Sequence, residues 1–318
     1  MVNDFERHRQ RPARRLLCSF VLTLLSLPLW PTPALAEPLV VASIGPVHAL
    51  AAAVMGELGE PLQMVRGYGS PHAYQMRPSD AANLHNADLV LWIGPALETF
   101  LQRPLEGHRD STRVLQLSKL QGLRLLPNRG SGARLSDNHS HAQDANTSFD
   151  AHIWLSPFNA KVMAAAIATE LGALDTANAS IYRKNADRLT EGIDAMEVRI
   201  ASRLAPVRTT PFVTFHDAFQ YFEEHFGLNA VGSVALGPDR LPSARHIRIL
   251  REKIAAAGVR CVFREPQFES ALVQILIEDS DARAYVLDPL GTAVEPGADA
   301  YFEMMNANTD ALVACLSP

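Results

Sequence analysis

Four side chains that can bind a metal lie beside short apolar segments typical of buried strands. They are His72 in the loop after residues 62–65, His152 within residues 150–157, His216 directly after residues 212–215, and Asp288 directly after residues 284–287. Any one of these histidines, taken alone, is more often a structural residue. Four such side chains at comparable positions favour a shared site.

The position of these side chains at strand ends predicts where that site lies. In an open α/β sheet, ligands bind in the crevice outside the carboxyl ends of the strands. Two of the four residues come from each half of the chain, so we expect them to meet in one cleft between two lobes. Three imidazoles and one carboxylate form a tetrahedral ligand set for zinc. A fifth residue, Glu265, ends the apolar segment around Cys261. It could orient a ligand by a hydrogen bond or pair with an arginine.

The elements that must position these residues alternate between strands and helices, which predicts parallel sheets covered by helices. In the first half we expect strands at 39–44, 62–65 and 89–93. We expect one helix at 47–55, a short helix with Ser79 as its N-cap, and a helix that follows Gly94-Pro95 and ends at Phe100. In the second half we expect strands at 212–215, around Cys261 and at 284–287, and helices at 217–226 and 243–257.

Two helical stretches, 157–171 and 177–204, separate the two halves. The second would be about 42 Å long at 1.5 Å per residue, long enough to span a domain. The sequence therefore predicts an α/β fold of two lobes, residues 37–175 and 206–318, joined by one long rigid helix at 176–205.

The N-terminus has the features of an export signal. Five arginines within residues 7–15 precede an apolar stretch at 16–29, and Ala34-Leu35-Ala36 is typical of a cleavage site. We expect cleavage after Ala36 and a mature chain that does not insert into the membrane, because the apolar stretch is short and contains Pro28. A retained membrane anchor is the alternative.

Composition excludes several classes of protein. The 318 residues are 47% hydrophobic and 20% charged, with a net charge of −5, so the chain can bury a core and lacks the basic character of nucleic-acid-binding proteins. Export also bears on Cys261 and Cys315, because an oxidising compartment favours a disulfide between the core strand around Cys261 and the C-terminal tail. Two buried free thiols remain the alternative.

Residues 128–149 break the pattern and are rich in Ser, Asn, Asp, Gly and Ala. This composition predicts a mobile surface loop. His139 and His141 within it could collect metal weakly, and a purely solvated loop is the alternative.

Five motifs resemble one family over essentially all of the mature chain. They are Ser70-Pro-His-Ala-Tyr-Gln-Met-Arg-Pro-Ser-Asp80, Ala87-Asp-Leu-Val-Leu-Trp-Ile-Gly-Pro95, Asp150-Ala-His-Ile-Trp-Leu-Ser-Pro157, Thr214-Phe-His-Asp-Ala-Phe-Gln-Tyr-Phe-Glu223 and Cys261-Val-Phe-Arg-Glu-Pro-Gln-Phe268. They resemble the zinc-specific periplasmic solute-binding proteins of bacterial metal-uptake ABC transporters.

This resemblance implies a function and assigns residues. It implies a non-enzymatic periplasmic protein, expected to be a monomer, that binds Zn²⁺ between two lobes and passes it to the membrane permease of an ABC transporter. It carries the three-histidine site onto His72, His152 and His216, and a disulfide onto Cys261 and Cys315. Residues 128–149 match the family's loop rich in histidine and acidic residues, although only two histidines are present here.

The fourth ligand is Asp288 or a water. Some members of the family use a glutamate directly before the first histidine, but here that residue is Pro71, which has no donor side chain. Three neutral imidazoles leave a bound ion with a charge of +2, so a carboxylate is favoured electrostatically. The opposing interpretation is that Asp288 caps the turn at Pro289.

Two other functions compete with zinc transport. A zinc hydrolase also uses three histidines and an open position, but the chain has no His-Glu-x-x-His motif and no clearly placed general base. A manganese or iron carrier, or an adhesin, could share the architecture. Harder cations favour oxygen ligands, and the third nitrogen donor, His216, argues for zinc.

Overall fold

The computed structural model describes residues 37–107, 111–129, 149–235, 242–268, 271–278 and 280–318. The expected export signal, residues 1–36, lies outside this part of the chain. Residues Glu37–Pro318 form one compact unit. None of the helices in the described residues has the length and apolar character needed to cross a membrane.

The first half of this unit contains a parallel sheet of four strands in the order β2-β1-β3-β4. The strands are β1 (Val40–Ala42), β2 (Leu62–Gln63), β3 (Leu89–Trp92) and β4 (Arg113–Gln116). Every residue of β1 and β3 is buried, as expected for central strands covered on both faces. The helices that follow the first three strands are α1 (Gly45–Met55), α2 (Pro78–Asn86) and α3 (Thr99–Glu106).

The second half repeats this topology with the strand order β6-β5-β7-β8. Its strands are β5 (Phe212–Thr214), β6 (Ala230–Ser233), β7 (Cys261–Arg264) and β8 (Arg283–Val286). Its connecting helices are α6 (Gln220–Phe226), α7 (Ala244–Ala257) and α8 (Ala271–Ile277). All pairings in both sheets are parallel, which confirms the predicted α/β fold class. The chain order reverses between β5 and β7, so the loops after these two strands lie at the switch point where ligands bind.

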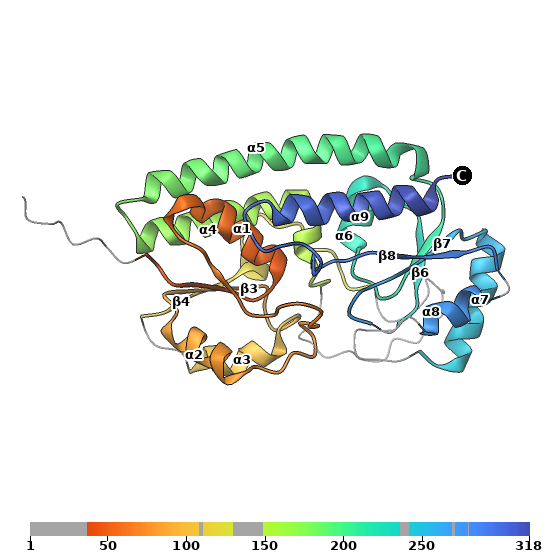
Figure 1. Ribbon diagram of the computed structural model, residues 1–318, viewed down its shortest axis with the longest axis horizontal. Helices are drawn as coiled ribbons and strands as arrows, with labels where there is room; N and C mark the ends of the chain where they lie inside the picture. Colours follow the sequence, from red (N-terminus) through yellow and green to blue (C-terminus); the bar gives the residue numbers. More distant parts are fainter. Residues whose placement is uncertain (1–36, 108–110, 130–148, 236–241, 269–270, 279) are drawn as a thin grey trace, which may run out of the picture. The chain divides into compact units, whose positions relative to one another are not determined.

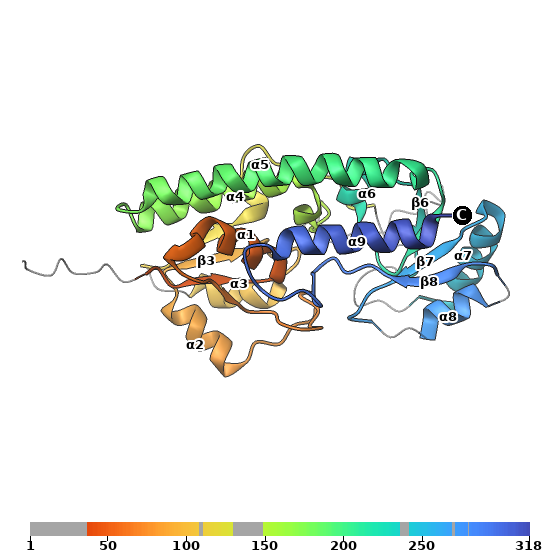
Figure 2. The same ribbon diagram turned by 45° about the horizontal axis from the view of Figure 1, so that its top comes forward.

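Three long helices form a layer beside the two sheets. They are α4 (Pro157–Leu174), α5 (Ala179–Leu204) and α9 (Ala300–Leu316). Figure 1 and Figure 2 show α4 and α9 lying along α5, which extends past elements of both halves. With 26 residues, α5 confirms the prediction of one long helix between the two sheets, and it is about 39 Å long. Gly192 lets α9 approach, because a Cβ at this position would lie 3.0 Å from the ring of Phe302.

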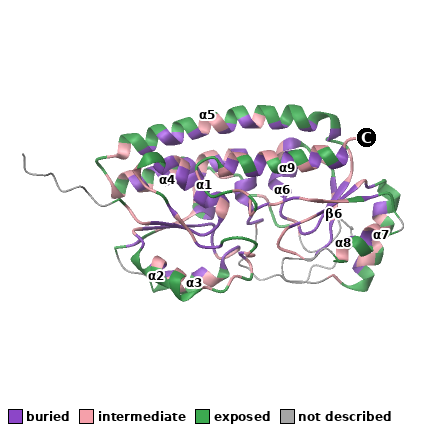
Figure 3. Cartoon of the chain, in the orientation of Figure 1, coloured by how far each residue is buried: buried purple, intermediate pink, exposed green. Residues whose placement is uncertain are grey.

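One apolar core continues from the first sheet to the second. It contains Val40 and Leu91 from the first sheet, Ile193 from α5, and Phe212 and Phe263 from the second sheet. Figure 3 shows that α1, α4 and α9 also contain buried residues, drawn in purple. Protein interiors pack like organic crystals, so this shared core resists a change in the distance between the sheets.

Several helices begin at residues other than the predicted ones, and α1 and α5 differ by only two residues. The helix α2 starts at Pro78, with Arg77 as its N-cap, because proline is favoured in the first turn and Asp80 accepts a hydrogen bond from the Arg77 amide. The prediction of Ser79 as N-cap is therefore wrong by two residues. The helix after Gly94-Pro95 begins only at Thr99, because the buried Glu98 carboxylate accepts hydrogen bonds from the Ile93 and Gly94 amides.

The helix α6 starts at Gln220 instead of residue 217, and it ends as predicted at Gly227, which has a positive φ of 66°. The helix α7 begins directly after its cap, Ser243, and this confirms the prediction for residues 243–257. Four elements were not predicted from the sequence: β4, β6, α8 and α9.

The predicted disulfide is present. Cys261 of β7 and Cys315 of α9 are joined, with a Cα–Cα distance of 6.1 Å. Both residues are fully buried. The bond therefore fixes the C-terminal helix to a central strand of the second sheet.

Removing this disulfide should destabilise the protein. The bond closes a loop across a sequence separation of 54, so Cys261→Ala/Cys315→Ala should lower the free energy of unfolding by up to about 4 kcal/mol. Urea unfolding followed by circular dichroism measures the difference, and chemically reduced wild-type protein should match the double variant. Identical unfolding midpoints for all three samples would contradict this expectation.

Candidate metal centre

Three of the four predicted ligands come together in the structure. One nitrogen from each of His72, His152 and His216 lies within 4.8 Å of the other two, and no other group of three metal-binding side chains meets this limit in the described residues. His72 lies in the loop between β2 and α2, His152 lies at the start of the short turn that leads into α4, and His216 lies two residues after the end of β5. The ring centroids are 5.1 to 6.0 Å apart.

The spacing of the nitrogens of His152 and His216 fits two ligands of a tetrahedral ion. Zinc binds imidazole nitrogen at about 2.0–2.1 Å, which places two tetrahedral ligand atoms about 3.3 Å apart. Nε2 of His152 and Nε2 of His216 are 3.2 Å apart. The residues present therefore fit a small divalent cation.

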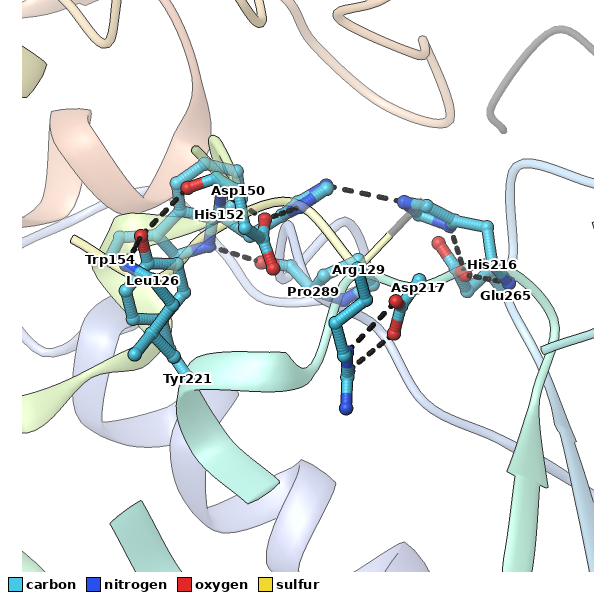
Figure 4. Close-up of polar contacts among 10 residues, drawn as sticks. All are labelled: Leu126, Arg129, Asp150, His152, Trp154, His216, Asp217, Tyr221, Glu265 and Pro289. Carbon is cyan, nitrogen blue, oxygen red and sulfur yellow. Dashed lines mark hydrogen bonds and ion pairs between the residues drawn. The ribbon is translucent and has the colours of Figure 1, made fainter. Parts of the chain in front are cut away.

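A buried carboxylate orients His152. Oδ1 of Asp150 accepts hydrogen bonds from Nδ1 of His152 at 2.7 Å and from its backbone amide at 2.9 Å (Figure 4). A carboxylate only accepts hydrogen bonds when ionised, so Nδ1 carries the proton and the lone pair of Nε2 points into the cluster. Asp150 was not predicted as a site residue, although its position two residues before His152 is a usable signal.

Glu265 orients His216 in the same way. Oε1 of Glu265 accepts a hydrogen bond from Nδ1 of His216 at 2.5 Å, as Figure 4 shows. Of the two roles considered for Glu265, this contact supports the orientation of a ligand. Because Glu265 follows β7 and His216 follows β5, the pair lies at the switch point of the second sheet.

These two carboxylates also determine the charge of the site. With both Nδ1 protons donated to carboxylates, two Nε2 lone pairs face each other at 3.2 Å. That contact is favourable only with positive charge between the nitrogens, either a metal ion or a proton. Asp150 and Glu265 together carry two negative charges, which match the charge of a divalent cation.

The pKa values of two histidines move in opposite directions. Burial, followed by the neighbouring His152 and His216, places the pKa of His72 well below 6.5. Burial alone would also lower the pKa of His216, but the charge and hydrogen bond of Glu265 outweigh burial and raise it. His72 is therefore neutral and ready to bind a metal over a wider pH range than His216.

The three histidines line a very small cavity. Its volume is about 10 Å³, and Ser70, Pro71, Trp154, Glu265, Gln267, Phe268, Pro289 and Leu290 complete its wall. Nε2 of His72 is buried there and has no hydrogen-bond partner among the described residues. A cavity of this volume holds about one water-sized particle, so it suits a single ion.

Asp288 does not belong to this group in the structure. Its Oδ1 accepts a hydrogen bond from the Leu290 amide, and its Oδ2 accepts from the amide and hydroxyl of Thr292. These contacts match the alternative interpretation of Asp288 as the cap of a turn. The other predicted metal-binding residues, His139 and His141, lie outside the described residues.

The chain on both sides of residues 130–148 contacts the site. Arg129 forms ion pairs with Asp217, next to His216, and with Glu223. The Tyr221 hydroxyl donates to the Asp150 carbonyl at 2.8 Å and accepts from the Leu126 amide at 3.0 Å (Figure 4). Sequence analysis missed this network, because its members are far apart in the chain.

Comparison with known proteins agrees with this geometry. Residues 40–315 match the family described as zinc-uptake complex component A, periplasmic (ZnuA). The high-affinity zinc uptake system protein ZnuA of Brucella suis is 38% identical over 305 residues, which cover 87% of this chain and 91% of the relative.

Two solved structures share the fold. A crystal structure of ZnuA has a TM-score of 0.74 at 24% identity and covers 87% of this chain and 98% of its own. The SBP FpvC of Pseudomonas aeruginosa in complex with Mn²⁺ has a TM-score of 0.75 at 24% identity, covering 88% and 98%.

The family match, together with the two parallel sheets, the long helix and the histidine cluster, assigns the chain to the periplasmic solute-binding proteins for metal ions. Within this class, the match over residues 40–315 and the 38% identity to a curated relative decide the family. The chain belongs to the ZnuA family.

The opposite pKa shifts can be measured directly. In protein treated with a chelator, imidazole NMR titration should show His216 protonating above its ordinary pKa and His72 remaining neutral well below pH 6.5. Glu265→Gln should lower the pKa of His216 because it removes the stabilising negative charge. Equal pKa values for the two histidines in the wild type would contradict this electrostatic assignment.

Proposed function

We propose that this protein binds one Zn²⁺ through His72, His152 and His216 in the periplasm and delivers it to the membrane permease of a zinc ABC transporter. The observation that carries this proposal is the cluster of three imidazoles, two of them oriented by buried carboxylates. Membership of the ZnuA family supports both the cargo and the transporter.

Ligand chemistry favours zinc over manganese or iron. Three imidazole nitrogens suit zinc, whereas manganese prefers carboxylate, carbonyl and water oxygen. The fold alone does not decide the metal, because a neighbour of the same fold is in complex with Mn²⁺. The three nitrogen donors of this chain are what favours zinc over manganese.

The size of the cavity favours a carrier over a zinc hydrolase. A catalytic zinc site needs an open position for water and room for the substrate beside the metal. Here the cavity of about 10 Å³ is lined by histidines, Trp154, Phe268 and Pro289, and a single ion matches this volume.

The remaining parts of the proposal concern the whole chain. We place the cleavage of the export signal after Ala36, since the compact unit begins at Glu37. Residues 37–175 and 206–318 form the two lobes and 176–205 the linking helix, and the mature protein acts as a monomer. His139 and His141 serve at most as an auxiliary metal site.

Each of the three histidines should be required for tight binding. His72→Ala, His152→Ala and His216→Ala should each weaken zinc binding by at least about 100-fold, because each removes one of the few ligands of the ion. Competition with a chromogenic chelator measures the affinity. The matched control is His85→Ala, an exposed histidine on α2, which should bind zinc like the wild type.

Two results would contradict this proposal. If all three histidine variants fold and retain wild-type affinity, the zinc site lies elsewhere in the chain. A hydrolytic activity that depends on these histidines would instead favour the enzyme.

Deleting residues 130–148 should leave the tight binding step unchanged. The three proposed ligands all lie outside this segment, and it contributes only two histidines. Calorimetry on a variant with a short Gly-Ser linker between Arg129 and Phe149 should still show one zinc per chain with wild-type affinity. Loss of that step would mean that the segment supplies a ligand.

A further inference from the structure

Gln267 has a buried amide group with no evident structural use. It lies in the turn after β7, two residues beyond Glu265. Both Oε1 and Nε2 of its side chain are buried, and neither has a hydrogen-bond partner among the described residues. Most buried polar atoms in proteins are paired, because an unpaired amide loses its hydrogen bonds to water without replacement. This side chain therefore calls for an explanation.

Gln267 lies in the wall of the histidine cavity. Gln267 lines the same small cavity as His72, His152 and His216. That cavity has room for about one water-sized particle, so a residue in its wall lies near any single particle that occupies it. Nε2 of His72, the other unpaired polar atom in this wall, belongs to a proposed ligand.

Three histidines leave one position of a tetrahedral ion open. An amide oxygen is an acceptor with lone pairs and is able to fill that position, whereas the amide nitrogen is not. The rival residue, Asp288, uses both carboxylate oxygens to cap its own turn. Its charge is also not required, because Asp150 and Glu265 already balance a divalent ion.

We propose that the side-chain oxygen of Gln267 contacts the bound cation at the position that the three histidines leave open. This inference rests on the proposed function, since it takes the three histidines as the other ligands. A neutral fourth donor keeps the charge of the site balanced. It also completes the ligand sphere without admitting a further solvent molecule.

The test compares Gln267→Leu with Gln274→Leu, an exposed glutamine on α8. Gln267→Leu should weaken zinc binding about 10- to 100-fold, the loss typical of supporting residues at metal sites. Substitution with Co²⁺ provides a second readout, because its visible absorption bands respond to the donor atoms. The bands should change in Gln267→Leu and stay unchanged in Gln274→Leu.

Stability separates ligand binding from a structural role. After chelator treatment, Gln267→Leu should melt at or above the wild-type temperature, because leucine needs no hydrogen bonds. If this variant melts lower or fails to fold, the amide supports the structure and the proposal is overturned. Gln267→Glu keeps an oxygen donor and adds charge, so it should raise the affinity for Mn²⁺ relative to Zn²⁺.

Two further results would overturn the inference. One is wild-type zinc affinity and wild-type Co²⁺ bands in Gln267→Leu. The other is a band change in Asp288→Ala with none in Gln267→Leu, which would assign the fourth position to Asp288. Failure of the proposed function would give a different result, because His216→Ala would then bind zinc with wild-type affinity.

Discussion

The site depends on two hydrogen bonds between buried carboxylates and imidazoles. Asp150 and Glu265 each hold one Nδ1–H, and this leaves the Nε2 atoms of His152 and His216 facing each other at 3.2 Å. Such a pair of lone pairs is stable only around positive charge. The orientation of the rings and the charge of the site therefore come from the same two contacts.

Maintaining that distance between the two nitrogens requires the two halves of the fold to keep their relative position. The ligands come from a loop after β2, a turn before α4 and the end of β5, so no single element holds them. The continuous core that includes Ile193 of α5 resists relative movement of the two sheets. The bond from Cys261 to Cys315 fixes α9 to the second sheet and thereby adds to this resistance.

Sequence reasoning identified the elements with strong local signals and missed those without them. Short buried strands and the uninterrupted helix α5 have clear apolar patterns, and His216 follows such a strand directly. The short strand β6 has the weak sequence Ala-Val-Gly-Ser, so only its pairing with β5 defines it. By contrast, α9 carries a detectable signal, because Tyr301, Met304, Met305, Leu312 and Cys315 are buried at helical spacing. The late start of α3 accompanies hydrogen bonds of Glu98 to the nearby Ile93 and Gly94 amides and to the distant Ser43 hydroxyl. Before α6, Asp217 forms an ion pair with Arg129, a contact between distant residues that no local pattern contains.

The expectation for Asp288 follows from an electrostatic rule that the structure can satisfy in a second way. The rule is that a buried divalent ion needs compensating negative charge. Sequence reasoning looked for that charge among the ligands themselves and so favoured a carboxylate in the fourth position. In the structure two carboxylates, Asp150 and Glu265, lie behind the imidazoles of His152 and His216, and would balance the charge of a bound ion through them. Once two carboxylates are present behind the histidines, a third would leave the site with excess negative charge, and a neutral donor suits the fourth position better.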